Sequence, residues 1–292
     1  MRLGLHTSTA GSLAAAALEA WGVGANTFQI FSASPRMWRA SPPAKADCAE
    51  LARLRDAHDL TPLIIHDNYL INLASFDEAI RAKSIAAFRG EIERALLIGA
   101  EYLVFHPGAA KGHAAKDAIR AVAEGLRDAA HGLSSPRLRL LIENTAGQGS
   151  ALGSKLEELA EIALQAQPCV DFEIGFCLDT CHSLAAGYDV ASPAGWTVFA
   201  GTVEQVLGWR RIPVIHANDS KGPLGSRLDR HENIGAGHIG DEGFRRILTD
   251  PRLETKAFIL ETPVEQEGDD RRNLEKLKEL CQKRRTSQTN SK

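Results

Sequence analysis

The sequence predicts an α/β protein that folds as a single (β/α)8 barrel, with eight parallel strands that alternate with helices. Three observations support this prediction. The 292 residues match the usual length of one such barrel. Short apolar runs alternate with segments of helical periodicity along the chain. No long polar linker interrupts this alternation, so we expect one barrel domain over residues 1–281 and a disordered polar tail over 282–292.

Eight apolar runs have the length and composition of buried strands. They cover residues 2–6, 27–31, 62–66, 102–106, 139–143, 176–179, 213–216 and 258–261. Segments with the three-to-four-residue spacing of helices lie between them, for example 12–23, 84–99, 115–131 and 155–166. We therefore expect each strand to be followed by a helix that covers the outside of the barrel.

The composition excludes several classes of protein. The chain has 34 basic and 37 acidic side chains, so its net charge of −3 does not by itself point to a polyanion partner. A local basic patch would nevertheless suffice to bind one. Five irregularly spaced cysteines do not form a disulfide framework and favour a reducing cytoplasm. No apolar run is long enough for a signal peptide core or a membrane span, so we expect a cytoplasmic protein without membrane contact.

Six of the expected strands end on a residue that can bind a metal ion. These residues are His66, His106, Glu143, Asp179, His216 and Glu261. A single histidine at a strand end is usually a packing residue, but six such residues would each leave an ionisable group beside an apolar core. Because the carboxyl ends of barrel strands meet at one mouth, we expect all six side chains to converge there on metal ions.

Two further pairs of potential ligands lie close to this mouth. His182 follows Asp179 by three residues in the turn after its strand, and Asp229 and His231 lie in a glycine-rich polar loop over 218–240. Five histidines and four carboxylates suit zinc better than magnesium or calcium, which prefer oxygen ligands. Nine ligands can hold three ions, and such a cluster catalyses phosphodiester hydrolysis.

Long stretches of the chain closely resemble the endonuclease IV family of abasic-site DNA repair enzymes. The similar stretches are HDNYLINLASF (66–76), FHPGAA (105–110), IENTAGQGSALG (142–153), LDTCHSLAAGYD (178–189), HANDSKGPLGSRLDRHENIGAGHIG (216–240) and ILET (259–262). The resemblance implies a TIM barrel that holds three zinc ions. Manganese can replace some of these ions. It also implies a monomeric enzyme that acts on double-stranded DNA with abasic sites or blocked 3′ ends. Cleavage on the 5′ side of the abasic site would leave a 3′-hydroxyl and a 5′-deoxyribose phosphate.

The resemblance also implies a role for each ligand. His66 and His106 would hold the first zinc, and Glu143 would bridge to the second. The second ion would be completed by Asp179, His216 and Glu261, and the third would be held by His182, Asp229 and His231. Within this set, Glu143 and Glu261 are the expected catalytic residues.

Several residues are candidates for DNA contacts. Tyr69 and Arg36 match the side chains that the family inserts at the flipped-out nucleotide, and Trp38 follows closely. The chain departs from the family pattern just before Arg36, where Ser34 and Pro35 replace amide-bearing residues. Since proline lacks an N–H donor, we expect different DNA contacts in this loop. Candidates for phosphate contacts in the loop over 218–240 are Lys221, Arg227 and Arg230.

Three other patterns carry less functional weight. Residues 235–240 match G-x-G-x-x-G but follow no buried strand, so they do not predict a dinucleotide site. Cys177 and Cys181 flank Asp179, and we interpret them as buried structural thiols. His6 ends the first strand, where it can support the metal ligands without binding a metal itself.

Two other functions account for part of the pattern. Sugar isomerases and epimerases also bind metals at the mouth of a similar barrel, but they need only one or two ions and give no role to Asp229, His231, Arg36 or Tyr69. A non-catalytic, metal-dependent DNA-binding protein would not need an open, water-bearing cluster. The complete set of nine ligands therefore favours the nuclease.

Overall fold

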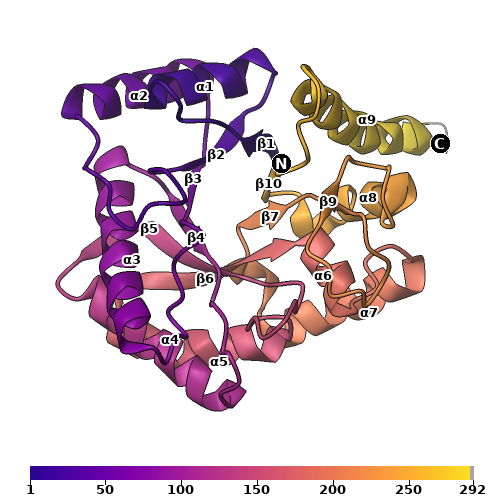
Figure 1. The fold of residues 1–292 in the computed structure, drawn as a ribbon. Helices are drawn as coiled ribbons and strands as arrows, with labels where there is room; N and C mark the ends of the chain where they lie inside the picture. The colour runs from indigo at the N-terminus through magenta and orange to yellow at the C-terminus, as the bar shows by residue number, and fades with distance from the viewer. Residues whose placement is uncertain (290–292) are drawn as a thin grey trace.

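Eight parallel strands close into a barrel in the computed structural model of the chain (Figure 1). They are β1 (Arg2–His6), β2 (Thr27–Phe31), β3 (Leu63–His66), β4 (Tyr102–Phe105), β5 (Ser134–Glu143), β6 (Asp171–Asp179), β7 (Val214–His216) and β10 (Ala257–Leu260). Consecutive barrel strands pair with each other, and β10 pairs with β1 to close the ring. The predicted eight-stranded barrel is therefore confirmed. The structure describes the backbone of residues 1–289 and the side chains of residues 1–281.

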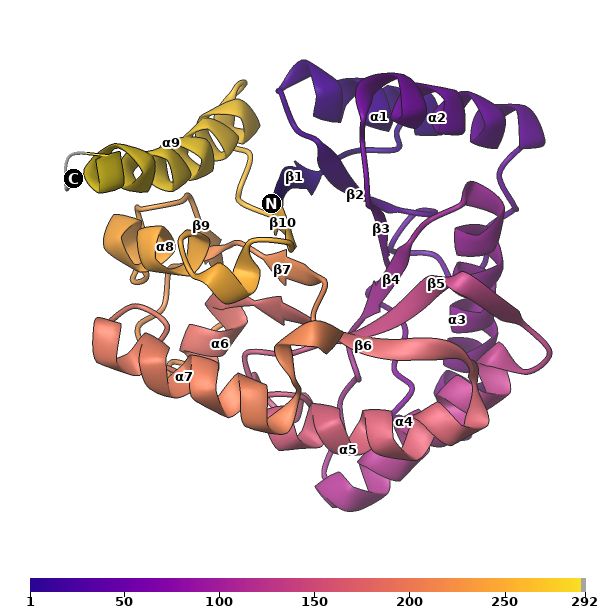
Figure 2. The same cartoon turned by 180° about the vertical axis from the view of Figure 1, so that it is seen from behind.

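The main helices lie around the outside of the barrel, as Figures 1 and 2 show. They are α1 (Leu13–Gly22), α2 (Lys45–His58), α3 (Glu78–Ile98), α4 (Ala115–Ala130), α5 (Leu156–Ala166), α6 (Thr180–Ala186), α7 (Pro193–Val206), α8 (Gly240–Leu248) and α9 (Asp269–Thr289). The disordered tail expected over 282–292 has side chains outside the described residues, so it stays a prediction. No helix in the described part of the chain is both long and apolar enough to cross a membrane.

Local sequence sets where the helices begin and end. Asp77 precedes α3, and its carboxylate accepts the N–H of Ile80 at 2.9 Å. Ser192 caps α7 in the same way, and Pro193 follows it in the first turn. A short side-chain acceptor before the first turn satisfies an N–H group that has no partner inside the helix. Gly99 ends α3 with a φ of 75°, a conformation that glycine adopts without strain.

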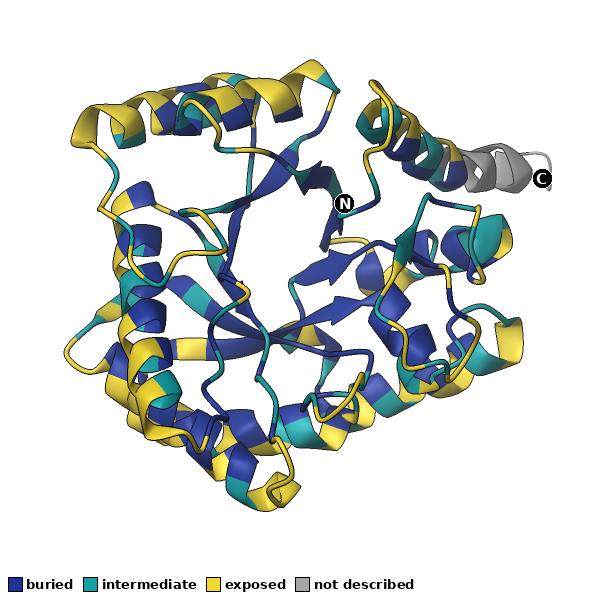
Figure 3. Ribbon diagram, viewed as in Figure 1, coloured by how far each residue is buried: buried dark blue, intermediate teal, exposed yellow. Residues whose placement is uncertain are grey.

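The chain buries two apolar layers. A ring of side chains inside the barrel consists of Ile64, Val104, Leu141, Cys177, Val214 and Ile259. A much larger layer lies between the strands and the surrounding helices and includes Phe28, Phe88 and Phe258. Figure 3 shows this arrangement, with strands that are mostly buried and helices whose exposed residues lie on their outer faces. The strands are therefore buried on both faces, as expected for a parallel barrel.

Strands β1 and β2 approach each other closely at Gly4. A Cβ atom at this position would lie only 1.9 Å from the carbonyl oxygen of Thr27 on β2. The two strands pair in register here, with Gly4 opposite Thr27. The missing side chain therefore allows the first strand to pack into the ring.

The segment over 218–240, expected to be an irregular loop, contains a small hairpin. Strand β8 (Asp219–Ser220) pairs antiparallel with β9 (His231–Glu232), and Ser220 lies opposite His231. Two-residue strands are too short to produce a recognisable apolar alternation in the sequence. The hairpin brings His231 back beside Glu261, directly after β10, at the mouth of the barrel.

Candidate metal centre

The six ligand-type residues at the strand ends share one position relative to the barrel interior. Each lies two residues after a member of the inner ring, so that Ile64 precedes His66, Leu141 precedes Glu143 and Ile259 precedes Glu261. Side chains two apart on a strand point to the same face. The inward direction that places the ring residues in the core therefore directs all six potential ligands over the mouth of the barrel.

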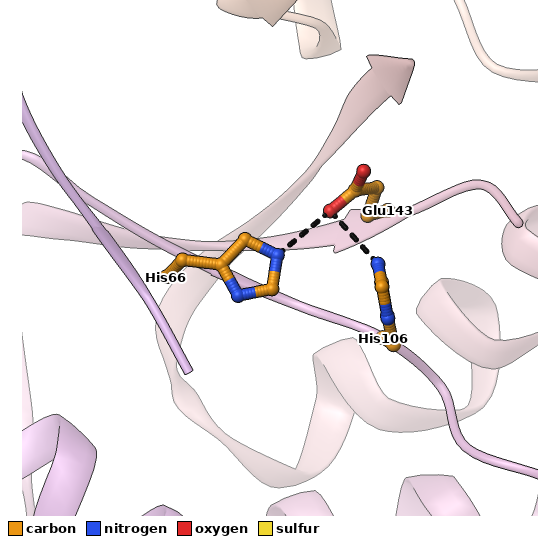
Figure 4. A group of neighbouring side chains, drawn as sticks. All are labelled: His66, His106 and Glu143. Atoms are coloured by element: carbon orange, nitrogen blue, oxygen red, sulfur yellow. Dashed lines mark hydrogen bonds and ion pairs between the residues drawn. The ribbon is translucent and has the colours of Figure 1, made fainter. Parts of the chain in front are cut away.

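The first group of potential ligands contains His66, His106 and Glu143. The Nε2 atoms of both histidines point toward the same carboxylate oxygen of Glu143, at 3.0 Å from His66 and 3.1 Å from His106 (Figure 4). The two rings meet edge to face, with centroids 5.2 Å apart. All three ligand atoms lie within 4.8 Å of one another, which is close enough to surround one metal ion.

The second group contains Glu143, Asp179, His216 and Glu261. The other oxygen of Glu143, Oε1, lies 2.9 Å from Nδ1 of His216, and Oε2 of Glu261 lies 3.3 Å from the same nitrogen. One ligand atom from each of the four residues falls within 4.8 Å of the others. Since the two oxygens of Glu143 face different groups, this carboxylate is placed to bridge two ions.

The third group contains His182, Asp229 and His231. Oδ1 of Asp229 lies 3.2 Å from Nε2 of His182 and 3.7 Å from Nε2 of His231. Helix α6 supplies His182, whereas the loop after β8 and strand β9 supply the other two. The structure therefore brings all nine predicted ligands together in three adjacent groups.

Backbone carbonyl groups orient three of the histidine rings. Nδ1 of His66 contacts the carbonyl of Asp67 at 2.9 Å, Nδ1 of His182 contacts that of Asn144 at 2.9 Å, and Nδ1 of His231 contacts that of Glu261 at 3.0 Å. A carbonyl oxygen can only accept, so each Nδ1 carries the proton of the neutral ring. In the neutral ring each Nε2 then carries a lone pair, as a metal ligand requires, and in the protonated ring it donates to the nearby carboxylates.

Two buried amides that were not predicted from the sequence support the second group. Gln29 on β2 donates from Nε2 to Glu261 at 2.6 Å, while its Oε1 contacts Nε2 of His216 at 2.9 Å. Asn218 donates to Asp179 at 2.6 Å and accepts the N–H of Glu261 at 2.8 Å. A polar residue within the apolar run TFQIF was a signal that could have identified Gln29.

His6 contacts the same network from the end of β1. Its Nδ1 lies 3.0 Å from Nε2 of Gln29 and 3.8 Å from Glu261. Burial lowers the pKa of His6, which favours the neutral ring. His6 therefore lies behind the ligands and contacts one of them, in keeping with the supporting position expected from the sequence.

The ligands have strongly complementary charges. Burial raises the pKa of Glu143, but His216 and His106 outweigh this effect and hold the pKa well below its usual range. Burial lowers the pKa of His66, yet its hydrogen bond to Glu143 and the charge of Glu143 raise it to about 9. Burial raises the pKa of Asp229, but the hydrogen bond and the charge of His182 outweigh this effect and lower the pKa to about 2. Carboxylates this close to one another stay ionised only beside positive charge, which protonated histidines or bound metal ions can supply.

A pocket of about 330 Å³ opens above the three groups. Members of the first and third groups line its floor, and Phe31, Tyr69 and Val264 lie along its wall. The side chain of Tyr69 is 66% exposed and meets the ring of Phe31 edge-on at 5.3 Å. An aromatic side chain is therefore available to a ligand that enters the pocket.

The other DNA-contact candidates lie in different surroundings. Arg36, Arg227 and Arg230 are exposed, and Arg230 donates to the carbonyl of Asp229 at 2.7 Å. Lys221 is also exposed and forms a long ion pair of 3.9 Å with Glu232. Trp38 is half-buried against the outer apolar layer and lines a separate groove beside α3. The structure thus places Trp38 outside the metal pocket.

Cys177 and Cys181 are buried beside the ligands. Cys177 belongs to the inner ring, and burial raises the pKa of its thiol to about 12. Burial likewise raises the pKa of Cys181 to about 12, and its Sγ contacts the carbonyl of Arg230 at 3.6 Å. Both thiols therefore stay protonated near neutral pH, as expected of structural cysteines.

Comparisons with known proteins agree with this geometry. Residues 15–283 match the family described as xylose isomerase-like TIM barrel. The probable endonuclease 4 of Solibacter usitatus is 56% identical over 281 residues, which cover 96% of this chain and 97% of that protein. Endonuclease 4 of Thermus thermophilus is 42% identical over 92% of this chain and 94% of its own length. A crystal structure of endonuclease IV from Thermus thermophilus superposes with a TM-score of 0.85 at 38% identity, covering 97% of this chain and 100% of that one.

The fold and the family match define the chain as a xylose isomerase-like TIM barrel. Within that class it belongs to the endonuclease 4 family, as its resemblance in sequence predicted. A D-tagatose 3-epimerase-like protein also superposes, with a TM-score of 0.71, but at 19% identity it shares the fold alone. The comparisons therefore favour the endonuclease over the sugar epimerase that the sequence left as an alternative.

Proposed function

We propose that this chain is a DNA repair endonuclease that hydrolyses the phosphodiester on the 5′ side of an abasic site in duplex DNA. The products would be a 3′-hydroxyl and a 5′-deoxyribose phosphate, and blocked 3′ ends would be trimmed at the same site. One observation carries the proposal: nine ligands form three adjacent groups at the mouth of a barrel from the endonuclease 4 family.

The mixture of imidazole and carboxylate ligands fits zinc, with manganese as a partial substitute. His66 and His106 would hold the first ion and share Glu143 with the second, which Asp179, His216 and Glu261 would complete. His182, Asp229 and His231 would hold the third. When bound, such ions lower the pKa of a water molecule and neutralise charge on the phosphate.

The chain's own residues would hold the reacting groups in place. Glu143 would fix the spacing between the first and second groups, because its two oxygens face one each. Glu261 is held by Gln29 and Asn218, so its carboxylate would keep one orientation during the reaction. Orientation of this kind is a large part of what an enzyme contributes to phosphoryl transfer.

Recognition of the abasic site would come from the rim of the pocket. Tyr69 and Arg36 would enter the space left by the missing base, where an aromatic ring and a guanidinium can stack. Arg227, Arg230 and Lys221 would contact phosphates, since all three are exposed in the loop that carries Asp229 and His231. Trp38 would act indirectly, by anchoring the loop that carries Arg36 to the outer apolar layer. Cys48, Cys169, Cys177 and Cys181 are free thiols, which supports a cytoplasmic enzyme, and we expect it to act as a monomer.

The test is cleavage of a duplex oligonucleotide that carries one defined abasic site. We expect rapid cutting by the metal-loaded chain, loss of cutting after prolonged chelation, and recovery when zinc is added back. A duplex of the same sequence with an intact base is the control and should stay whole. Extension of the product by a polymerase would verify the 3′-hydroxyl. Failure to cut the abasic duplex at full metal content would contradict the proposal.

A further inference from the structure

The G-x-G-x-x-G segment over 235–240 surrounds a carboxylate of the chain itself. Four N–H groups of this segment converge on the side chain of Asp219, and a fifth comes from the next residue. The donors are the backbone N–H groups of Ser220, Gly235, Gly237, Ile239 and Gly240, at 2.8, 3.0, 3.0, 2.8 and 3.2 Å. Glycine-rich segments of this type commonly cradle phosphate groups, but here the anion is an aspartate.

Asp219 is completely buried, with no exposed surface. Among the described residues, no lysine, arginine or histidine forms an ion pair with its carboxylate. A buried charge without a counter-ion is costly unless hydrogen bonds compensate it. The five N–H groups supply that compensation, so the carboxylate and the segment over 235–240 depend on each other.

Glycine is needed where the segment approaches Asp219 most closely. A Cβ atom on Gly237 would lie 2.5 Å from Oδ1 of Asp219 and 2.5 Å from the carbonyl oxygen of Ser220. Gly235 and Gly240 adopt φ values of 86° and 68°, which other residues rarely tolerate. The glycines therefore let the backbone wrap around the carboxylate.

The carboxylate connects the candidate metal centre to this segment. Its neighbour Asn218 donates to Asp179 and Glu261 of the second group. Its other neighbour, Ser220, pairs with His231 of the third group across the β8–β9 hairpin. His231 and Asp229 are the only proposed ligands that lie in a loop or a two-residue strand instead of following a barrel strand. Apart from the carbonyl of Glu261, which contacts Nδ1 of His231, they depend on contacts outside the barrel strands.

We propose that Asp219 is a positioning residue for the third metal site, which holds the hairpin so that His231 and Asp229 face His182. This inference rests on the three-ion site proposed above. Asp219 itself does not face the pocket or the substrate. Its carboxylate would act through the backbone of residues 235–240, which packs against β8 and thereby keeps β9 in place.

The test is Asp219→Asn, which keeps the size of the side chain but points an amide N–H at the N–H groups around it. Elemental analysis after dialysis in buffered zinc should give three ions for the wild type and two for the variant. Loss of a group that orients a ligand typically weakens metal binding by ~10–100-fold. We therefore expect zinc to restore the third ion, and with it kcat, at ~10–100-fold higher free concentration. KM should change less than kcat.

Glu242→Gln is the matched control, because Glu242 is an exposed acid on α8 just after the segment. It should keep three ions and wild-type kcat. Asp219→Asn with three ions at wild-type affinity would overturn the inference, and so would the loss of all three ions together, which would indicate a general folding role. If the wild type itself bound fewer than three ions, the proposed function would fail instead.

A second measurement keeps the inference testable if Asp219→Asn does not fold. In the wild type, the N–H groups of Gly235, Gly237, Ile239 and Gly240 should exchange with solvent more slowly than the N–H of Leu224, an exposed residue of the same loop. Gly237→Ala should reproduce the selective loss of the third ion, whereas Gly201→Ala, which has open space around its Cβ, should not. Fast exchange at these four amides would contradict the role of Asp219.

Discussion

The backbone N–H of Tyr69 donates a 3.2 Å hydrogen bond to the carbonyl oxygen of Pro35. This bond joins the loop after β3 to the loop after β2, so the two candidate insertion residues, Tyr69 and Arg36, belong to one connected rim. Proline has no N–H to donate, but here it serves as the acceptor. Since every residue offers a backbone carbonyl, the presence of proline at position 35 does not prevent this contact between the loops.

Tyr69→Ala should weaken binding to an abasic duplex by about tenfold, since loss of one stacking aromatic costs ~1–3 kcal/mol. Binding can be measured by fluorescence anisotropy with metal content determined in parallel. The number of bound ions should not change, because Tyr69 contacts no proposed ligand through its hydroxyl. Tyr69→Phe retains the ring and should bind nearly as the wild type does. Unchanged affinity in the alanine variant would exclude Tyr69 from the DNA interface.

Glu261→Gln should leave DNA binding largely intact and reduce cleavage by ~100-fold or more, because it removes a negative charge from the second group. Single-turnover cleavage of the abasic duplex, beside a binding measurement, separates the two effects. Glu267→Gln changes an exposed acid a few residues further along and serves as the control. Wild-type turnover in Glu261→Gln would remove this residue from the catalytic site.

The metal-free protein should lose stability as the pH rises from about 6.5 to about 9. His66 has a folded-state pKa of about 9, above its ordinary value of 6.5, because Glu143 outweighs the effect of burial. A raised folded-state pKa stabilises the fold fully below the unfolded value, and this contribution is lost as the pH rises through the folded value. Thermal unfolding of the chelated protein across this range should therefore show a falling melting temperature.

A rise in pH over the same range should have a different effect on the stability of the zinc-loaded protein. Zinc binds the neutral imidazole, so its ligands hold no proton that rising pH could remove. The melting temperature of the loaded protein should stay nearly constant, and the apparent zinc affinity should increase with pH. His66→Gln should flatten part of the decline in the metal-free protein. Equal pH dependence in the loaded and chelated forms would show that protons and zinc do not compete at these ligands.

Gly4→Ala should destabilise the barrel by ~1–3 kcal/mol or more, because the added methyl group meets the Thr27 carbonyl at 1.9 Å. For a chain of this size that corresponds to a fall of several degrees in melting temperature. Gly201→Ala is the matched control: it lies in α7, its Cβ would meet nothing within 4 Å, and the change should be neutral or slightly stabilising. Similar melting temperatures for the two variants would show that β1 and β2 can move apart.

The barrel and its six strand-end ligands could be predicted because one local rule governs both. Apolar side chains such as Ile64 and Ile259 must point inward, and two residues later His66 and Glu261 must point the same way. Asp229 and His231 could be predicted as ligands from their residue types and spacing. Nothing in the sequence indicated the hairpin that positions them.

The supporting contacts could not be predicted in the same way. Gln29 reaches His216 across 187 positions of the sequence, and such a contact depends on how strands pack within the closed ring. The segment over 235–240 follows no buried strand, and nothing in its sequence indicates that its N–H groups bond to Asp219. The direction of an N–H group depends on backbone torsion angles, which glycine leaves open. Both supports thus depend on tertiary structure that local patterns do not encode.

The pairing of β10 with β1 links the folding of the barrel to the assembly of its metal ligands. A chain that stops before β10 contains all but one of the nine ligands, yet its first strand has no partner on one side and the ring stays open. Glu261 directly follows the strand that closes the ring, so the second group of ligands is complete only when the barrel is closed. A copy that lacks β10 would therefore have neither a closed barrel nor a complete second group of ligands.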